Sequence, residues 1–470
     1  MSLPAKDTVM VVGGLGNCSG RSTLNGGGAT KAAWDAGSPS DFIGANGAPV
    51  DFCAAGTIDT DGGNVRITDA GSFTNVVNGA IVLCIFTATY ASDRYEVLSH
   101  TDNSITIDLA WSTDVPTAYA AVGGAVNSLQ EALDLNDGVT YNRFIYISGS
   151  TAGGAGTDLT TTTIKADTYG GSASSKVFVI GYNITLTAEA TVAVTTTTDL
   201  TGEAAAVDRA LLSIVTVDYL EFRNIDFDGG GKDNSQAMYG LYAAAGGDGA
   251  YSTFYNCQFH AAESSGAFAR TGPVNYIKCL FYLNGGYGLD SNGSVGFAWI
   301  SQCLFADNDL SDLYWRPNGC VCISSLFYDN GKDAGVGHGI MHSAGSGYTT
   351  YIGNTIYGNF TQGFCVNNSD YDICWINNAY AGNGDYGIHF GTMGLGDIGF
   401  FGFNLSGANT TGDYYFGGGA GTDFTNFANG SNVDSAQTAD ALFKTLTDNS
   451  EDFTPETGSD LIDAQLEGMA

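Results

Sequence analysis

The sequence has few basic residues, few prolines and no long apolar run. It contains 16 Lys and Arg against 49 Asp and Glu, so its formal net charge is -33 over 470 residues. Such an acidic chain repels phosphate, and we therefore expect no nucleic-acid partner. No apolar run reaches the roughly 18 residues that a membrane-spanning helix needs, so we expect no membrane insertion.

The ten cysteines form no CxxC pair and show no Cys/His spacing of the kind found in zinc sites. Residues 1–7 contain no basic stretch followed by an apolar one, which predicts no signal peptide. These features favour a chain that folds in a reducing cytoplasm, with its thiols packed in a core.

The sequence does contain a repeat, which is lengthened in places by loops. Its clearest column is aromatic and consists of Phe227, Phe259, Phe281, Phe305 and Phe327, followed by Ile356 and Tyr380. From Phe259 to Phe327 the successive members lie 22, 24 and 22 residues apart. A repeat of this length with apolar residues at alternate positions is typical of one turn of a β-solenoid.

Two further columns keep the same register. Cysteines stand two residues before the aromatic column, at Cys257, Cys279 and Cys303, and asparagines stand three residues after it, at Asn284, Asn308, Asn330, Asn359 and Asn383. Residues two apart on a strand face the same side, so thiols and rings should stack in the interior. Each turn Asn is expected to adopt the left-handed conformation and to hydrogen-bond to the Asn above and below.

These columns resemble the right-handed parallel β-helix repeat of pectate-lyase-like proteins, with its pattern Asn-x-x-Phe-x-x-Asn-x-x-x-Gly-Ile. The resemblance is clear over residues 218–390 and implies an all-β solenoid. Polysaccharide lyases, glycoside hydrolases, phage tailspikes and surface adhesins share this fold, so the fold alone does not choose a function.

The chain is predicted to have three parts. Residues 1–122 should form an N-terminal arm and a small β-rich module, whose short antiparallel strands lie within 60–112. Residues 123–430 should form the β-helix, preceded by a short capping helix that places Leu129, Ala132 and Leu133 on one face. Residues 431–470 should form a C-terminal cap, because 452–464 resemble the closing segment of viral and bacterial β-helix proteins.

One segment resembles an enzyme motif. Gly337-His338-Gly339 is similar to the Gly-His-Gly segment of polygalacturonase-type glycoside hydrolases, and Asp307 and Asp309 lie one coil earlier. The downstream Arg-x-Lys of that family is missing, since no Arg follows Arg316. A catalytic role for Asp307, Asp309 and His338 is therefore the lesser alternative to an ordinary surface turn. A lyase would need a basic residue, but the basic residues of this region share no column.

The same acidic loop suggests a metal site. Asp307, Asp309 and Asp312 supply only oxygen ligands, which suit Ca²⁺, although the loop lacks the glycine and distal Glu of an EF-hand. No other cofactor is expected.

Three functions remain open. The resemblance favours a non-enzymatic structural or adhesion protein of a virus particle, namely a capsid-decorating, head-fibre or tail protein of a tailed bacteriophage. Its partners would be other virion proteins and a host-surface glycan, and the family resemblance implies a homotrimer. The alternatives are a polysaccharide-active hydrolase or lyase, and a bacterial surface adhesin.

Overall fold

A computed structural model describes the chain in segments separated by gaps. The longer described segments are 51–74, 81–86, 93–112, 118–122, 143–148, 176–182, 189–196, 209–214, 219–230, 237–243, 251–269, 273–291, 297–315, 319–331, 335–343, 348–366, 373–391 and 398–416. Shorter pieces lie at 8–12, 157–160, 163–166, 419–420, 433–435, 443–445 and 452–455. The chain divides into two compact units, 1–195 with Tyr219–Asp226, and Thr196–Asp218 with Phe227–Ala470.

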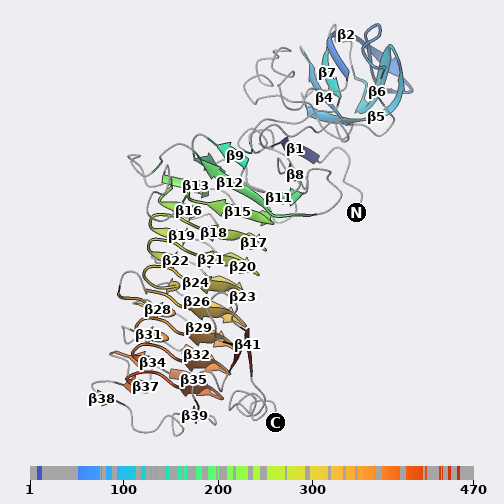
Figure 1. Cartoon of the computed structure of the whole chain (residues 1–470). Coiled ribbons are helices and arrows are strands. Elements are labelled where there is room, and N and C mark those ends of the chain that lie inside the picture. Colours follow the sequence, from blue (N-terminus) through green and yellow to red (C-terminus); the bar gives the residue numbers. More distant parts are fainter. Residues whose placement is uncertain are drawn as a thin grey trace. The chain divides into compact units, whose positions relative to one another are not determined.

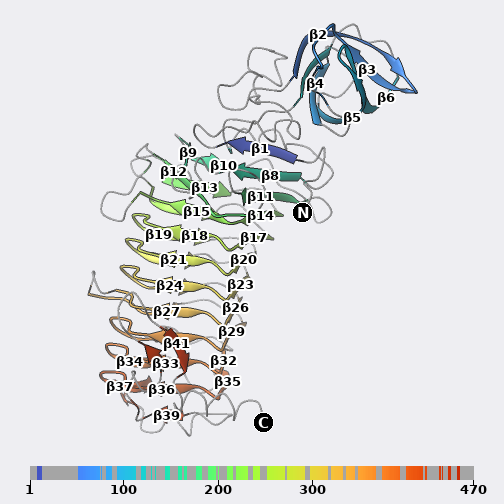
Figure 2. The ribbon, with the colours of Figure 1, turned by 45° about the vertical axis from the view of Figure 1, so that its right-hand side comes forward.

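Three sheets of 11 strands each make up the solenoid (Figures 1 and 2). Successive coils add parallel strands to each sheet, and only the last strand of one sheet, Gly419–Ala420, pairs antiparallel with its neighbour. We name the sheets in the order in which a coil visits them. Sheet 1 contains β1 (Thr8–Val12), β8 (Arg143–Ser148), β11 (Val177–Tyr182), β14 (Leu220–Arg223), β17 (Ser252–Tyr255), β20 (Val274–Ile277), β23 (Ala298–Ser301), β26 (Gly319–Ile323), β29 (Tyr348–Ile352), β32 (Ile373–Ile376) and β35 (Ile398–Gly402).

Sheet 2 contains β9 (Thr157–Thr160), β12 (Val192–Thr196), β15 (Ile225–Asp228), β18 (Gln258–His260), β21 (Leu280–Tyr282), β24 (Leu304–Ala306), β27 (Leu326–Tyr328), β30 (Thr355–Tyr357), β33 (Ala379–Ala381), β36 (Leu405–Gly407) and β39 (Val433–Ser435). Sheet 3 contains β10 (Ile164–Lys165), β13 (Ala210–Ile214), β16 (Tyr239–Ala243), β19 (Ser265–Ala269), β22 (Tyr287–Ser291), β25 (Leu313–Trp315), β28 (Ile340–His342), β31 (Phe364–Val366), β34 (Tyr386–Phe390), β37 (Gly412–Phe416) and β38 (Gly419–Ala420).

The predicted columns are the interior of the coils. The aromatic column lies in sheet 2, where Phe281 and Phe305 stack with ring centroids 4.5 Å apart and Phe305 and Phe327 with centroids 4.7 Å apart. All three rings are completely buried. Each such side chain contributes about 1.5–3 kcal/mol by burial, and each stacked pair adds about 0.5–1.5 kcal/mol. The sequence prediction of the solenoid is confirmed.

The turn between sheets 2 and 3 corrects one expectation. The left-handed residue is the one before each ladder asparagine, as at Leu283 (φ 54°), Asp307 (φ 52°) and Asp329 (φ 60°), and not the asparagine itself. The bend between sheets 1 and 2 uses the same conformation, for example at Asn256 and Lys278. The asparagine therefore contributes its side-chain amide, whereas the preceding residue adopts the unfavourable left-handed backbone conformation.

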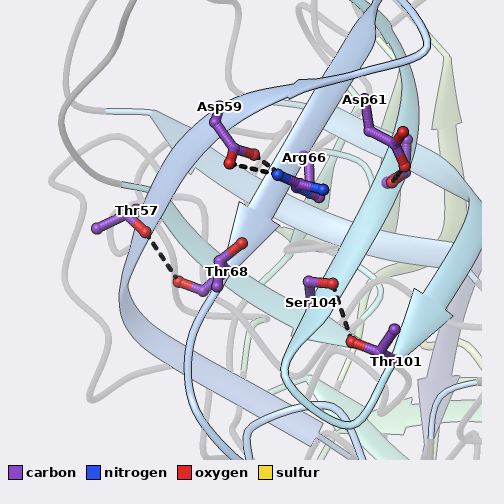
Figure 3. Close-up of polar contacts among 8 residues, drawn as sticks. Thr57, Asp59, Asp61, Arg66, Thr68, Thr101 and Ser104 are labelled. Atoms are coloured by element: carbon purple, nitrogen blue, oxygen red, sulfur yellow. Dashed lines mark hydrogen bonds and ion pairs between the residues drawn. The ribbon is translucent and has the colours of Figure 1, made fainter.

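The predicted N-terminal β module is a closed six-stranded barrel in the order β2-β3-β6-β5-β4-β7. Its strands are β2 (Asp51–Asp61), β3 (Asn64–Thr68), β4 (Ile81–Phe86), β5 (Asp93–Thr101), β6 (Ser104–Ala110) and β7 (Ala118–Val122). On its surface Arg66 donates to both carboxylate oxygens of Asp59, at 2.7 and 2.6 Å, and lowers the pKa of that carboxyl (Figure 3). Apolar side chains, including Val65 and Ile105, fill its interior.

The ends of the solenoid are described only in part. Of the predicted capping helix, Leu129 and Leu133 are helical and completely buried, and the remaining residues lie outside the described part of the chain. β1 from the predicted arm pairs with β8 and so belongs to sheet 1. Near the C-terminus, β40 (Phe443–Thr445) and β41 (Asp452–Pro455) form a two-stranded sheet, and the ring of Phe443 packs edge-on against Tyr357.

Within the described part of the chain, no helix has both the length and the apolar character needed to cross a membrane.

Candidate functional site

The asparagines after sheet 2 form a continuous buried ladder. In each coil the side-chain oxygen accepts from the Asn one coil earlier, as in Asn284 Nδ2 to Asn308 Oδ1 (2.8 Å) and Asn330 Nδ2 to Asn359 Oδ1 (2.7 Å). The same oxygen also accepts from the backbone N–H of that preceding Asn, for example Asn308 N at 3.0 Å from Asn330 Oδ1. Asn409 is the last ladder member in the described part of the chain. The predicted hydrogen bonding between the stacked amides is confirmed, and these bonds stabilise the turn.

A second ladder begins as thiols and ends as amides. Cys257, Cys279 and Cys303 are buried, and the thiols of Cys279 and Cys303 donate to backbone carbonyls. Ser325, Asn354, Asn378 and Asn404 then continue this column with the same side-chain to backbone bonding as the first ladder. Burial raises the pKa of Cys279 well above its usual range, so the thiol stays protonated. The structure gives these cysteines the packing role that the sequence predicted.

Asp312 is a further hydrogen-bond acceptor for two amides of the first ladder. Its strand register sets it opposite Gly288 and Gly339, at a position where an added Cβ would meet the ladder amide nitrogen at 3.0 and 2.9 Å respectively. Asp312 has a side chain there, and its carboxylate accepts from Asn308 Nδ2 (2.7 Å) and from Asn330 Nδ2. It is completely buried. Burial raises the pKa of Asp312 well above its usual range, against the opposing effect of the two amide donors.

His338 lies in the turn that leads into β28, and its tautomer is fixed. Thr361 donates its single hydroxyl proton to the carbonyl of Gly337 (2.6 Å), so its oxygen must accept from His338 Nδ1 (2.7 Å). The proton therefore sits on Nδ1, and Nε2 is the basic nitrogen. Burial lowers the pKa of His338 to about 4, and the imidazole is neutral at ordinary pH.

The groups around His338 come from the next two coils of sheet 3. The positive charge of His389 further lowers the pKa of His338, and the carboxylate of Asp385 opposes that shift. Gln362 follows Thr361 and donates to Asp385 Oδ2 at 2.8 Å. The sequence reading missed Thr361, Gln362, Asp385 and His389. The repeat length could have found them, because Gln362 stands 24 residues after His338 and shares its column.

The catalytic role suggested by the sequence for Asp307, Asp309 and His338 stays a prediction. The carboxylate that acts on His338 is that of Asp385, whereas Asp307 and Asp309 lie in the turn before sheet 3. A base with a pKa near 4 is poorly matched to proton transfer at neutral pH, and glycosidases use a pair of carboxyl groups. His338 is arranged to accept a hydrogen bond at Nε2.

The calcium site suggested at Asp307, Asp309 and Asp312 likewise stays a prediction. In the described segments, no group of three His, Cys, Asp or Glu side chains could hold a metal ion. Asp312 is turned into the core toward two amide donors, so it is not available to the turn. The loop looked like a set of surface oxygen ligands because three aspartates occur within six residues, but the register assigns the third to the interior.

The outer side of sheet 1 has a different chemistry. From β17 to β35 the outward side chains carry no charge, and we call this surface the neutral face. It consists of Thr253, Tyr255, Asn275, Ile277, Trp299, Ser301, Val321, Ile323, Thr350, Ile352, Cys374, Ile376 and Phe400. Trp299 is 39% exposed, and Tyr251, Phe297 and Tyr348 stand exposed just before the strands.

Comparison with known proteins agrees with this architecture. Residues 240–427 match the family model described as the right handed beta helix region. The protein is a right-handed parallel β-helix. No curated protein matches the chain.

Solved structures similar to this β-helix protein have diverse functions. Pectate lyase Pel9A is 16% identical, with 71% of this chain and 85% of that chain covered and a TM-score of 0.48. The A-module of the Azotobacter vinelandii mannuronan C-5 epimerase AlgE4 is 11% identical, with 62% and 97% covered and a TM-score of 0.38. ORF18 of Geobacillus virus E2 is 14% identical, with 61% and 56% covered and a TM-score of 0.32. At this level of similarity no function is transferred to this chain.

Proposed function

We propose that this chain is a non-enzymatic structural or adhesion protein of a virus particle, such as a capsid-decorating, head-fibre or tail protein of a tailed phage. In this role the β-helix is a rigid scaffold that presents its outer faces. The homotrimer and the host-surface glycan implied by the family resemblance belong to this proposal and stay predictions.

One observation carries the proposal: the polar side chains of the repeat are engaged in packing the coils. The carboxylate of Asp312 and the amides of the asparagine ladder are hydrogen-bonded to one another inside the solenoid. The nine described cysteines are thiols, and eight of them are buried. Such an interior makes the coils rigid, which suits a structural scaffold.

Purified particles from the natural source test the virion role. We expect peptides of this chain in gradient-purified particles at a fixed ratio to the major capsid protein, unchanged by washing with salt. Absence from particles, or a ratio that falls with each wash, would exclude a structural component.

A polysaccharide-active enzyme is the second candidate, because His338 keeps Nε2 as an acceptor next to Asp385. The purified protein can be incubated with neutral and acidic glycans and the reducing ends measured. Depolymerisation that His338→Ala abolishes, while Thr361→Val leaves the fold intact and shifts the pH profile, would favour the enzyme and overturn the scaffold proposal.

A further inference from the structure

The neutral face is an anomaly on this chain. Seven neighbouring strands of sheet 1, from β17 to β35, contribute its side chains, and none of those side chains is Asp, Glu, Lys, Arg or His. One cation lies over the face, where Lys278 Nζ is 5.7 Å from the ring centre of Tyr255. The whole protein has a formal net charge of -33, with 49 acidic residues among 470. An exposed sheet surface on so acidic a chain would ordinarily have its share of carboxylates. Their absence over seven coils marks the face as a contact surface.

The neutral face is mostly apolar, and its polar members are Thr253, Asn275, Ser301 and Thr350. The column nearest the bend contains Ile277, Ile323, Ile352 and Ile376, which are all partly exposed, and Trp299 stands in the adjacent column with 39% of its surface exposed. Strands lie about 4.8 Å apart and residues rise by about 3.3 Å, so seven strands of four residues cover roughly 30 by 13 Å, or about 400 Å². Soluble proteins with a contiguous apolar patch of this size commonly use it for binding.

The chemistry of the face selects its occupant. A cationic partner would be attracted to the carboxylates elsewhere on the chain. A sugar would find its hydrogen-bonding groups confined to Thr253, Tyr255, Asn275, Ser301 and Thr350, beside a column that contains four isoleucines. A second copy of the neutral face avoids these problems, because two acidic chains can meet there without repulsion between like charges at the contact. The two faces also have the same strand spacing, so their side chains can interdigitate as in a sandwich of two sheets about 10 Å apart.

We propose that the neutral face is the interface between two copies of this chain, packed sheet to sheet. The exposed rings of Tyr251, Phe297 and Tyr348 border the face and enlarge the contact. Two faces of about 400 Å² with this aromatic border approach the roughly 1,200 Å² at which specific interfaces begin. The contact is isologous, since each copy contributes the same surface. It does not depend on the proposed virion role, but it replaces the homotrimer that the family resemblance implies, and a wild type that sediments as a trimer would overturn it.

Sedimentation of the full chain over a wide range of protein concentration tests the interface. The informative variants are Trp299→Glu and Ile323→Glu. The matched control is Leu283→Glu, which adds the same charge at a residue that is 43% exposed in a turn outside the neutral face. The equivalent turn position carries Asp307 and Asp329 in the next two coils, so an acidic residue fits there.

We expect the wild type and Leu283→Glu to sediment as dimers, with association strengthened by added salt because salt screens the net repulsion. Trp299→Glu should raise the dimer dissociation constant by on the order of a hundredfold, with an unchanged circular dichroism spectrum. A wild type that is monomeric at all concentrations would overturn the proposal, as would a dimer that both face variants leave intact. Binding of a neutral oligosaccharide by a monomer, lost in Trp299→Glu, would identify the face as a glycan site instead.

Discussion

Replacing Asn330 by Ala should be among the most damaging single substitutions in the solenoid. Asn330 is completely buried, and its side chain makes five hydrogen bonds. Its oxygen accepts from the backbone N–H of Asn308 at 3.0 Å and from Asn308 Nδ2 at 3.4 Å. Its amide donates to the carbonyl of Tyr328 at 2.9 Å, to Asn359 Oδ1 at 2.7 Å and to the carboxyl group of Asp312. Each buried group left without a partner costs about 1–3 kcal/mol. We therefore expect Asn330→Ala to destabilise the fold by about 4–6 kcal/mol.

Asn359 supplies the matched comparison. It occupies the same ladder position one coil later and donates to Phe327 O and Asn383 Oδ1, both neutral acceptors. Asn359→Ala should therefore lower the free energy of unfolding by about 2–4 kcal/mol. This is less than for Asn330→Ala, because Asn359 does not make the bond that Asn330 donates to Asp312. In an Asp312→Asn background the two alanine substitutions should become nearly equal, because the carboxyl group that accepts from Asn330 is gone.

Urea unfolding followed by circular dichroism measures these differences, and hydrogen exchange of the neighbouring coils shows whether the loss is local. Asn275→Ala is the surface control, since Asn275 is partly exposed and makes a single 3.2 Å bond to Thr253. Its cost should stay below about 0.5 kcal/mol. The ladder argument fails if Asn330→Ala costs no more than Asn275→Ala, or if Asp312→Asn leaves the gap between the two ladder variants unchanged.

The pH dependence of Asp312 follows from the same geometry. Its folded pKa is raised, so the folded state holds this proton more tightly than the unfolded state does. The stability due to protonated Asp312 is fully present below the unfolded value near 3.8 and is lost as the pH rises through the folded pKa. Wild type and Asp312→Asn should be close in stability in acid, and the Asn variant should gain on the wild type toward neutral pH. A gap that is independent of pH would contradict this assignment.

Three further predictions concern other parts of the interior. Phe305→Ala removes the middle ring of a stack and should cost about 3–5 kcal/mol in urea unfolding, whereas a cost below 1 kcal/mol would mean that the stack is not tightly packed. His342 is completely buried with a pKa of about 4, so its contribution of about 3 kcal/mol is lost as the pH falls from about 6.5 to 4. His342→Phe should flatten that acid decline, and an equal decline in both proteins would count against it. Cys374 is the described cysteine that is not buried, so alkylation in dilute native protein, mapped by peptide mass spectrometry, should modify it before Cys279; equal rates would contradict the burial of Cys279.

The interior of the solenoid was predictable because its period is visible in the sequence. Phe281, Cys279 and Asn284 recur at fixed offsets, and each offset fixes which side of the strand the residue faces. The left-handed conformation was assigned to the wrong residue, since nothing in the sequence distinguishes the ladder Asn from the variable residue before it. Only the structure shows that Leu283 takes the positive φ.

The candidate site was harder to predict. The prediction relied on residues that are close in sequence within one coil, whereas the structure depends on which positions of successive coils are aligned. Asp307, Asp309 and Asp312 looked like one loop, yet Asp312 shares a column with Gly288 and Gly339, and that column faces the ladder amides. His338 was singled out for its glycine neighbours, whereas the groups that act on it lie one and two repeats downstream. The barrel was foreseen as an antiparallel module, but strand order and closure depend on contacts far apart in sequence.

The outer faces of the three sheets differ in the chemical groups that they present. Sheet 2 is covered in part by the C-terminal pair of strands, where Phe443 is 1% exposed against Tyr357. Sheet 3 presents a neutral imidazole that accepts a hydrogen bond, together with Asp385 and Gln362. Sheet 1 presents the uncharged face. Because the ladders lock each coil to the next, these faces cannot rearrange independently, so a ligand or partner must fit the rod as it stands.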